Sequence, residues 1–242
     1  MKSLAIVIPC KNEALRLNQS AILDAVSSMK NLSILFVDDG STDCTAAIIA
    51  HLAGLSSSID ALYLPENCGK AEATRRGVLH LLSNTTTDLI GFWDADLAVP
   101  LNEAVKFVDE FERDDSLELA IGSRWPHLGS QIDRRLLRGI AGNLMKSMIR
   151  LFLNAPVYDT QCGAKIMTRK LASKLFGKPF ISRWLFDIEL LKRMGLELRT
   201  HAIELPLGAY HDIEGSKMTL ADAFFSLFDL FRIAVATKSV KW

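Results

Sequence analysis

The sequence LIGFWDAD, residues 89–96, decides how this 242-residue chain folds. Its apolar part, residues 89–93, predicts a buried strand, and Asp94 and Asp96 come where that strand would end. Paired carboxylates there suit a hard divalent cation such as Mg²⁺ or Mn²⁺, which binds carboxylate oxygens and keeps open positions for water or phosphates. An Asp-x-Asp pair also occurs in solvated loops and helix caps, so the pair alone leaves both interpretations open.

Short apolar runs alternate with helix-like segments around this stretch. Strands are predicted at residues 4–8, 34–37, 61–64, 89–93 and 117–121, and helices at 12–29, 42–53, 70–82 and 102–111. Continuous apolar strands separated by helices predict an α/β fold of three layers (α/β/α), with a mostly parallel sheet between the helices. The second half departs from this alternation, with helices predicted at 134–153 and around 184–194.

Each of the first four predicted strands ends in a polar cluster. The clusters are PCKNE at residues 9–13, DDGSTD at 38–43, ENCGK at 66–70 and DAD at 94–96. Ligands of open α/β sheets bind at the carboxyl ends of the strands, so this coincidence predicts a binding site at that edge. Asp39 suits a ribose or base N–H, and Lys70 before a helix suits an anion, although both clusters also fit ordinary turns and helix caps.

Further charged residues occur in the second half. Arg124 ends the strand at 117–121, where it fits either phosphate binding or an ion pair, and Arg138 belongs either to an electropositive surface or to a solvated helix face. Asp159 and Asp187 lie among large apolar residues, which is typical of acid–base groups with raised pKa values and equally of a helix cap or of a pair with a nearby arginine. Lys217 follows a glycine in a polar segment that is either a loop closing on a phosphate or a surface turn.

Glu189 stands two residues after Asp187 in the same predicted helix. Residues two apart on a helix do not share a face, so at most one of these two carboxylates is expected to point into a cleft.

Composition excludes several classes of protein. Lys plus Arg equals Asp plus Glu at 28 each, so no overall positive charge favours nucleic acid. The four cysteines show no C-x-x-C spacing and no signal-like segment precedes them, which favours a cytoplasmic protein without a zinc site or disulfide framework. No apolar run approaches the roughly 18–20 residues that cross a bilayer. The Phe-rich stretch at 220–235 fits an interfacial helix, a core helix or a homo-oligomer contact.

Together the motifs resemble inverting nucleotide-sugar glycosyltransferases of the GT-A fold, and more narrowly the dolichyl-phosphate glucosyltransferases and polyprenyl-phosphate mannosyltransferases. The resemblance spans about residues 4–217 and rests on IPCKNE at 8–13, VDDGSTD at 37–43, NCGK at 67–70, DAD at 94–96, GSR at 122–124, DTQCGAK at 159–165, FDIE at 186–189 and EGSK at 214–217.

The resemblance implies one glycosyltransferase domain over residues 1–242, with a nucleotide-sugar half at 1–125, an acceptor half at 126–218 and an amphipathic C-terminal helix at 219–242. It implies that Asp94 and Asp96 hold Mg²⁺ or Mn²⁺. Substrate-binding roles are expected for Pro9, Lys11, Asn12, Glu13, Asp39, Lys70, Asp94, Arg138 and Lys217, and catalytic roles for Asp187, Asp159 and Arg124.

The implied reaction moves a hexose, glucose from UDP-glucose, to a polyprenyl or dolichyl phosphate at the cytoplasmic face of a membrane. A phosphate acceptor is already anionic and needs no strong base, whereas a hydroxyl acceptor would need one, with Asp187 and Asp159 as the candidates. Three alternatives stay open: a same-fold transferase with a saccharide or other soluble hydroxyl acceptor, a nucleotidyltransferase, and a membrane-associated binding module without activity.

Overall fold

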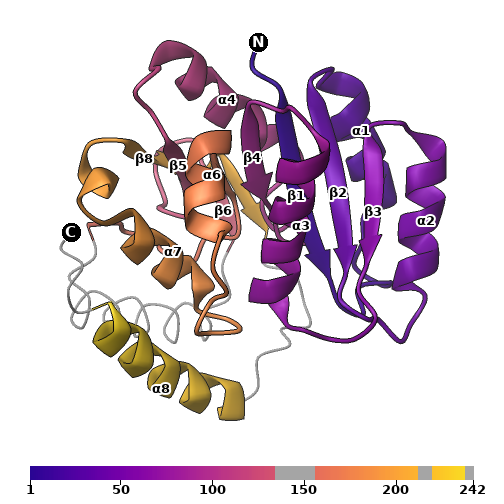
Figure 1. Cartoon of the computed structure of the whole chain (residues 1–242). Helices are drawn as coiled ribbons and strands as arrows, with labels where there is room; N and C mark the ends of the chain where they lie inside the picture. The colour runs from indigo at the N-terminus through magenta and orange to yellow at the C-terminus, as the bar shows by residue number, and fades with distance from the viewer. Residues whose placement is uncertain (134–155, 212–219, 238–242) are drawn as a thin grey trace.

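A seven-stranded mixed sheet forms the centre of the molecule (Figure 1), in a computed structural model that describes residues 1–133, 156–211 and 220–237. The strand order is β3-β2-β1-β4-β7-β5-β8. Its strands are β1 (Leu4–Cys10), β2 (Leu32–Asp38), β3 (Ile59–Tyr63), β4 (Leu89–Phe92), β5 (Leu119–Ser123), β7 (Lys165–Thr168) and β8 (Ala202–Pro206). Only β7 runs antiparallel to its neighbours, β4 and β5, so the predicted mostly parallel sheet is confirmed.

The chain turns back on the sheet next to β1. It runs from β1 outward to β2 and β3, and then returns to place β4 on the other side of β1. Such a reversal leaves a crevice at the carboxyl ends of the two strands that flank it, which is where ligands of open α/β sheets bind. A second, two-stranded sheet pairs β6 (Gln131–Asp133) with β9 (Ala209–His211).

Helices cover both faces of the large sheet, because successive residues of each buried strand point to opposite sides. Ile6 and Ile8 of β1 pack in the cluster that includes α1 and α4, whereas Ala5 and Val7 pack in the cluster that includes α3, α6 and α7. The helices are α1 (Gln19–Ser28), α2 (Thr45–Leu55), α3 (Lys70–Asn84), α4 (Ala104–Arg113), α6 (Arg169–Phe176), α7 (Phe186–Met194) and α8 (Leu220–Ala236), with short 3₁₀ turns η1 (Leu101–Glu103) and η2 (Gly195–Arg199). The three-layer prediction is therefore confirmed.

The first predicted helix, 12–29, is wrong over its first two turns. Asn12 has a left-handed backbone with φ of 52°, which a helix does not allow. Helix α1 begins only at Gln19, where the Asn18 side chain accepts the N–H of Ala21 at 3.1 Å and caps the helix. The helix predicted at 134–153 lies outside the described residues.

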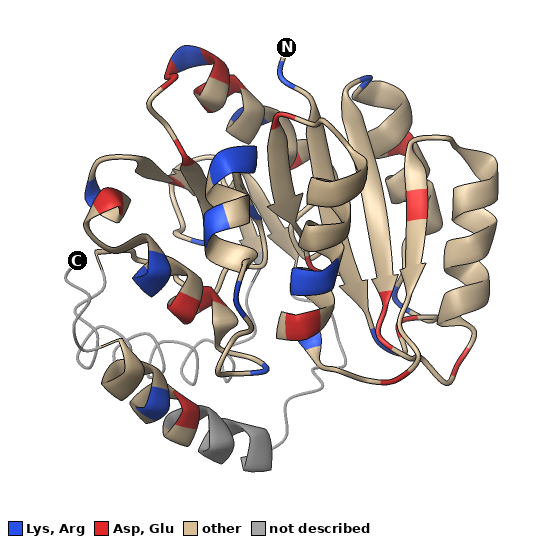
Figure 2. Cartoon of the chain, in the orientation of Figure 1, with Lys and Arg blue, Asp and Glu red and all other residues tan. Residues whose placement is uncertain are grey.

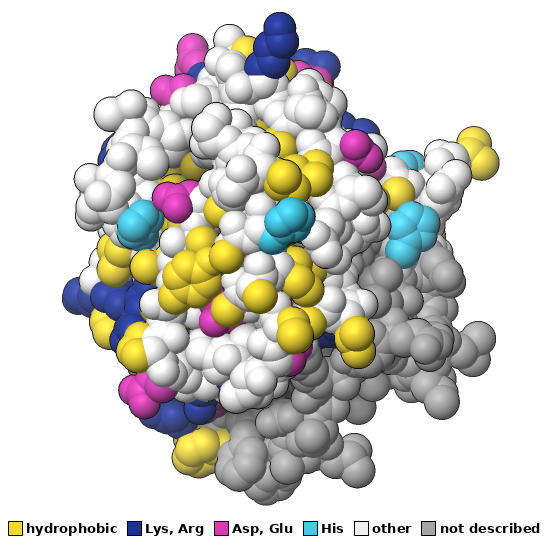
Figure 3. All heavy atoms as spheres, turned by 90° about the vertical axis from the view of Figure 1, so that its right-hand side faces the viewer, with side chains coloured by type: hydrophobic (Ala, Val, Ile, Leu, Met, Phe, Trp, Pro, Cys, Tyr) yellow, Lys and Arg dark blue, Asp and Glu magenta, His cyan; other side chains and the backbone are white. Residues whose placement is uncertain are grey.

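Helix α8 packs beside α7 and leaves an apolar face exposed. Leu230 and Ile233 are buried with Leu185 and Ile188. The exposed side chains are Phe228, Phe231 and Val235. Among the described residues, none of the helices has both the length and the apolar character needed to cross a membrane. On the side of the domain that Figure 3 turns toward the viewer, hydrophobic side chains are scattered in small groups among polar atoms.

Candidate functional site

The carboxyl ends of β1, β2 and β4 bring the polar clusters to one edge of the sheet. The arrowheads of these strands point to the lower edge in Figure 1, and Figure 2 shows acidic and basic residues together there. Pro9 belongs to the end of β1 and pairs in register with Val37 of β2. The predicted gathering of these clusters at one edge is therefore borne out by the topology.

Lys70 and Asp94 form an ion pair at this edge. Lys70 is the first residue of α3, Asp94 follows β4, and the Nζ–Oδ1 distance is 2.5 Å. Desolvation alone would raise the pKa of Asp94, but the charge and hydrogen bond of Lys70 outweigh it and place the pKa below its usual value. Desolvation opposes the charge on Lys70 too, yet the nearby carboxylates of Asp94 and Asp187 raise its pKa. Both partners are charged at neutral pH.

Asp96 lies on the same turn and has a raised pKa. Desolvation is the main cause and the negative charge of Asp94 is the second, while a hydrogen bond from the Ala98 N–H, at 3.1 Å, opposes them. A divalent cation would relieve this repulsion between neighbouring carboxylates. The described residues contain no group of three or more His, Cys, Asp and Glu side chains placed to hold a metal, so a cation on these two acids would keep positions for phosphate oxygens and water.

Gly163 packs directly against Asp94. A Cβ at residue 163 would lie 2.0 Å from Asp94 Oδ2, so only glycine fits while the carboxylate keeps this position. The loop before β7 thereby forms one wall of the site. The motif DTQCGAK alone does not predict the contact of Gly163 with Asp94, because that contact depends on tertiary structure.

Asp39 holds the loop that precedes Lys70. Its carboxylate accepts the N–H groups of Cys68, at 2.6 Å, and Gly69, at 2.8 Å, and it is almost fully buried. Gly69 has φ of 90°, a conformation that favours glycine. By contrast, the neighbouring Asp38 has one buried carboxylate oxygen, Oδ1, without a hydrogen-bond partner among the described residues. A nucleoside N–H or hydroxyl would satisfy that oxygen, so Asp38 joins Asp39 as a candidate.

The cluster after β1 is braced against residues 38–43. Lys11 Nζ donates to a carbonyl of that segment, and Asn12 Oδ1 accepts one of its N–H groups at 2.8 Å. Glu13 is buried and binds Arg16 through both carboxylate oxygens, at 2.6 and 2.7 Å. These contacts shape the two loops, and the nucleoside roles of Lys11, Asn12 and Glu13 stay predictions.

Arg124 and Asp159 form a two-pronged ion pair. Arg124 Nε and an Nη atom donate to the two Asp159 oxygens at 2.7 Å each, and Asp159 is fully buried. Desolvation opposes the charge on Arg124, but the hydrogen bonds and charge of Asp159 raise the Arg124 pKa well above its usual value. The Glu204 carboxylate accepts the N–H groups of Tyr158 and Asp159 at 2.8 and 2.7 Å, which holds this loop on β8.

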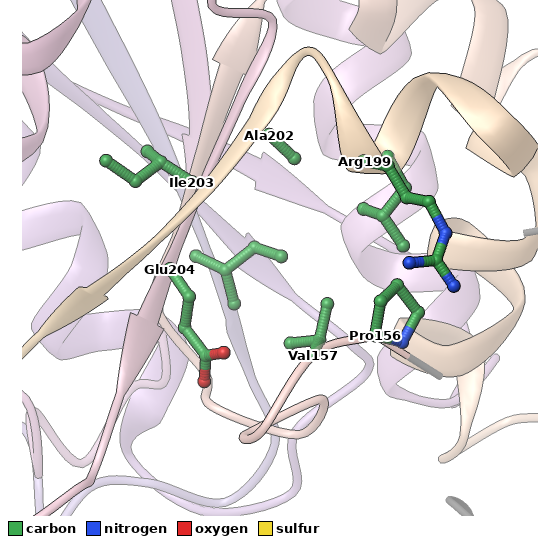
Figure 4. Close-up of a pocket in the computed structure, with 8 residues that line it drawn as sticks. Pro156, Val157, Arg199, Ala202, Ile203 and Glu204 are labelled. Carbon is green, nitrogen blue, oxygen red and sulfur yellow. The ribbon is translucent and has the colours of Figure 1, made fainter. Parts of the chain in front are cut away.

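A cavity of about 280 Å³ lies behind the same loop. Figure 4 shows it between β8 and the segment at Pro156 and Val157, with Glu204 and Arg199 among its labelled side chains. Asp94, Asp96 and Lys70 do not line it. The cavity is therefore separate from the carboxylate pair at the strand ends.

Asp187 forms an ion pair with Lys165, a residue for which the sequence predicted no role. Lys165 is fully buried, and its Nζ donates to Asp187 Oδ1 at 2.5 Å and to the Cys162 carbonyl at 2.7 Å. Glu189 points elsewhere and accepts the N–H of Ile181 at 2.7 Å. The two carboxylates therefore have different partners, as expected for residues two apart on a helix. Arg138 and Lys217, the other predicted site residues, lie outside the described residues.

Known proteins resemble this chain in sequence over most of its length. The model of the family described as "Glycosyl transferase family 2" matches residues 5–176. The chain is 32% identical over 216 residues to a dolichyl-phosphate beta-glucosyltransferase of Trichomonas vaginalis, covering 86% of this chain and 63% of that protein. It is 29% identical over 255 residues to the dolichyl-phosphate beta-glucosyltransferase of Saccharomyces cerevisiae, covering 96% of this chain and 74% of that protein.

Solved structures share the fold. Glucosyl-3-phosphoglycerate synthase from Mycobacterium tuberculosis in complex with UDP aligns with a TM-score of 0.68 at 19% identity, covering 100% of this chain and 82% of that one. The complex of that enzyme with Mn²⁺, UDP and glucosyl-3-phosphoglycerate aligns with a TM-score of 0.65 at 20% identity, covering 98% and 78%. At such identities the likeness establishes the fold alone.

Proposed function

The chain belongs to glycosyl transferase family 2, and from this premise we propose that it transfers glucose from UDP-glucose to a polyprenyl or dolichyl phosphate, with inversion at the sugar carbon. Membership of this family and the fold shared with the solved structures confirm the resemblance to GT-A glycosyltransferases that the motifs indicated. The relatives named dolichyl-phosphate beta-glucosyltransferases support the sugar and the acceptor. Structures that contain UDP with Mn²⁺ or Mg²⁺ support the donor and the cation.

The donor is proposed to bind residues 1–125. Asp94 and Asp96 would hold Mg²⁺ or Mn²⁺, which when bound stabilises negative charge on the departing nucleoside diphosphate. Lys70, at the start of α3, adds positive charge beside the same phosphates, where the helix N-terminus also favours an anion. The nucleoside is assigned to the loops after β1 and β2, through Pro9, Lys11, Asn12, Glu13 and Asp39.

The ion pairs of the two candidate bases, Asp159 and Asp187, are the observation that favours a phosphate as the acceptor. Asp159 is bound by Arg124 and Asp187 by the buried Lys165, so both carboxylates are already engaged in ion pairs within the protein. A hydroxyl acceptor needs a base to take its proton, whereas a phosphate acceptor arrives already ionised and needs no strong base. We therefore assign Asp159 and Asp187 to positioning, and we assign Arg124, together with Arg138 and Lys217 of the half that spans residues 126–218, to the acceptor phosphate.

The test is Asp96→Ala, assayed with labelled UDP-glucose, Mn²⁺ and undecaprenyl or dolichyl phosphate. Loss of the cation site removes several kcal/mol of transition-state stabilisation, so the organic-extractable product should fall by about 100-fold or more. Asp24→Ala, at an exposed position of α1, is the matched control and should keep wild-type activity. Undiminished product from Asp96→Ala would remove the proposed metal role.

The same assay separates the rival functions. Labelled product that stays in water would favour a soluble hydroxyl acceptor, and release of pyrophosphate would favour a nucleotidyltransferase. A protein that binds liposomes but fails to bind UDP with Mn²⁺ in calorimetry would be a binding module without activity.

The proposed location is the cytoplasmic face of a membrane, reached through the C-terminal segment 219–242. Phe228, Phe231 and Val235 are more than half exposed on one side of α8, as an interfacial helix requires. Replacing Phe228 and Phe231 by serine should abolish flotation with liposomes. If flotation persists and the protein instead changes from dimer to monomer, the face is an oligomer contact.

A further inference from the structure

Residues 181–185 connect the C-terminal helix to the start of α7. Ser182 is almost fully buried, and its hydroxyl donates to Asp229 Oδ2 of α8 at 2.7 Å. The Ser182 Oγ atom in turn accepts the N–H groups of Trp184 at 3.2 Å and Leu185 at 2.9 Å, just before α7 begins. One hydroxyl therefore fixes the shape of this segment and ties it to α8.

The next residue, Arg183, reaches the other half of the molecule. Its carbonyl accepts the N–H of Ala71 in the first turn of α3 at 3.1 Å. Its guanidinium donates to the carbonyl and side-chain oxygens of Asn67, at 3.3 Å each. A Cβ at Gly69 would lie 2.5 Å from Arg183 Nε, so the arginine packs directly on this loop.

The loop at residues 67–69 is thus held from two sides, by the Asp39 carboxylate and by Arg183. Lys70 follows it immediately and reaches Asp94. Arg183 therefore contacts the loop that leads directly into this lysine. In Figure 1, α8 lies beside α7 on the lower side of the domain, which is the side to which β1, β2 and β4 point.

We propose that Ser182 and Asp229 are positioning residues of the donor site. They hold Arg183 against residues 67–69 and thereby keep Lys70 where it meets Asp94 and the donor phosphates. The C-terminal helix then forms part of the frame of the donor site, in addition to any contact that its exposed face makes. The inference rests on the proposed function in taking Lys70 as a phosphate ligand.

Three variants at α8 separate the proposed contact from its surroundings. Asp229→Leu removes the acceptor and leaves the buried Ser182 hydroxyl without a partner, whereas Asp229→Asn keeps an oxygen for it. Arg232→Gln is the matched control, because Arg232 binds the other Asp229 oxygen, at 3.3 Å, and does not touch the loop. Ser182→Ala, with Ser182→Thr as its rescue, removes the same hydrogen bond from the other side, and it also takes the acceptor away from the N–H groups of Trp184 and Leu185.

Hydrogen exchange of the Cys68, Gly69 and Ala71 amides in the nucleotide-free protein measures the positioning directly. Loss of one hydrogen bond should speed exchange at these amides by about fivefold in Asp229→Leu and Ser182→Ala, with wild-type rates in Asp229→Asn, Ser182→Thr and Arg232→Gln. Unchanged exchange in both disrupting variants would overturn the proposal, and so would equal acceleration at every amide of the domain, which indicates general loss of stability.

Calorimetric titration with UDP and Mn²⁺ tests the consequence for the donor. The dissociation constant should rise by about fivefold in the two disrupting variants and stay at the wild-type value in the three others. An unchanged constant in Asp229→Leu and Ser182→Ala would overturn the link to the donor. Wild-type protein that binds no UDP would instead refute the proposed function, and the exchange experiment would still decide whether Ser182 and Asp229 position the loop.

Discussion

The substitution Gly163→Ala tests whether the Asp94 carboxylate acts in the reaction from the position that it has in the structure. The added Cβ would lie 2.0 Å from Asp94 Oδ2 and 2.3 Å from its Cγ. Real Cβ atoms essentially never approach other atoms within 3.0 Å, so the carboxylate or the loop before β7 must move by about 1 Å. Residue 163 is not among those with a left-handed backbone, so alanine is strained only through this contact.

The size of the effect follows from that displacement. A misplacement of 1 Å at a reacting site costs about 100-fold in rate, or about 2.7 kcal/mol of transition-state stabilisation. Overpacking reduces the free energy of unfolding by about 1–3 kcal/mol, and the lower end applies because the obstructing group is a partly exposed side chain. We expect kcat/KM for UDP-glucose, with Mn²⁺ and a lipid phosphate, to fall by about 100-fold in a protein that stays folded.

Gly54→Ala is the matched control, because nothing lies within 4 Å of a Cβ at that position in α2. It should keep wild-type kcat/KM and gain up to about 1 kcal/mol of unfolding free energy from helix propensity. Both proteins are compared by steady-state kinetics and by urea unfolding. Wild-type kcat/KM in Gly163→Ala would refute the reasoning, since Asp94 could then serve the reaction from a different position.

Three further predictions concern buried groups. Lys165→Met leaves the Asp187 carboxylate buried without its cation and should cost about 3–5 kcal/mol in urea unfolding, whereas the double variant with Asp187→Leu should recover most of that loss. Burial raises the pKa of the Cys162 thiol from 9.0 to about 11, so the folded state favours the neutral thiol. The stability that the neutral thiol contributes is fully present below pH 9, and about 2–3 kcal/mol of the unfolding free energy is lost as the pH rises to 11. Unfolding free energies at pH 8.5 and 11 should therefore differ less in Cys162→Ala than in the wild type. Gly77→Ala places a Cβ 2.5 and 2.7 Å from valine methyl groups of β1 and β2, and should lower the unfolding free energy by about 1–3 kcal/mol despite the better helix propensity of alanine.

The first half of the fold was predictable because four of its five strands, β1, β2, β4 and β5, are buried on both faces. Such strands appear as continuous apolar runs, and all five predicted ones are found within about two residues of their expected limits. Strands β7 and β8 escaped prediction because their sequences, KIMT and AIELP, are short and contain charged residues. In β7 the charge is Lys165, which is buried only because Asp187, 22 residues away, neutralises it. That partner is a property of the tertiary structure and leaves no periodic signal.

The same difficulty limits what sequence says about the site. A carboxylate among large apolar residues has either a raised pKa, when it stands alone, or a retained charge, when a buried cation meets it. Asp159 and Asp187 each meet a cation, and their partners lie 35 and 22 residues away. The residues around each acid in the sequence do not distinguish the two cases, so only the tertiary contacts of the segment after β5, of β7 and of α7 show which one applies. The gathering of the polar clusters at one edge, by contrast, follows from the order of strands and motifs along the chain.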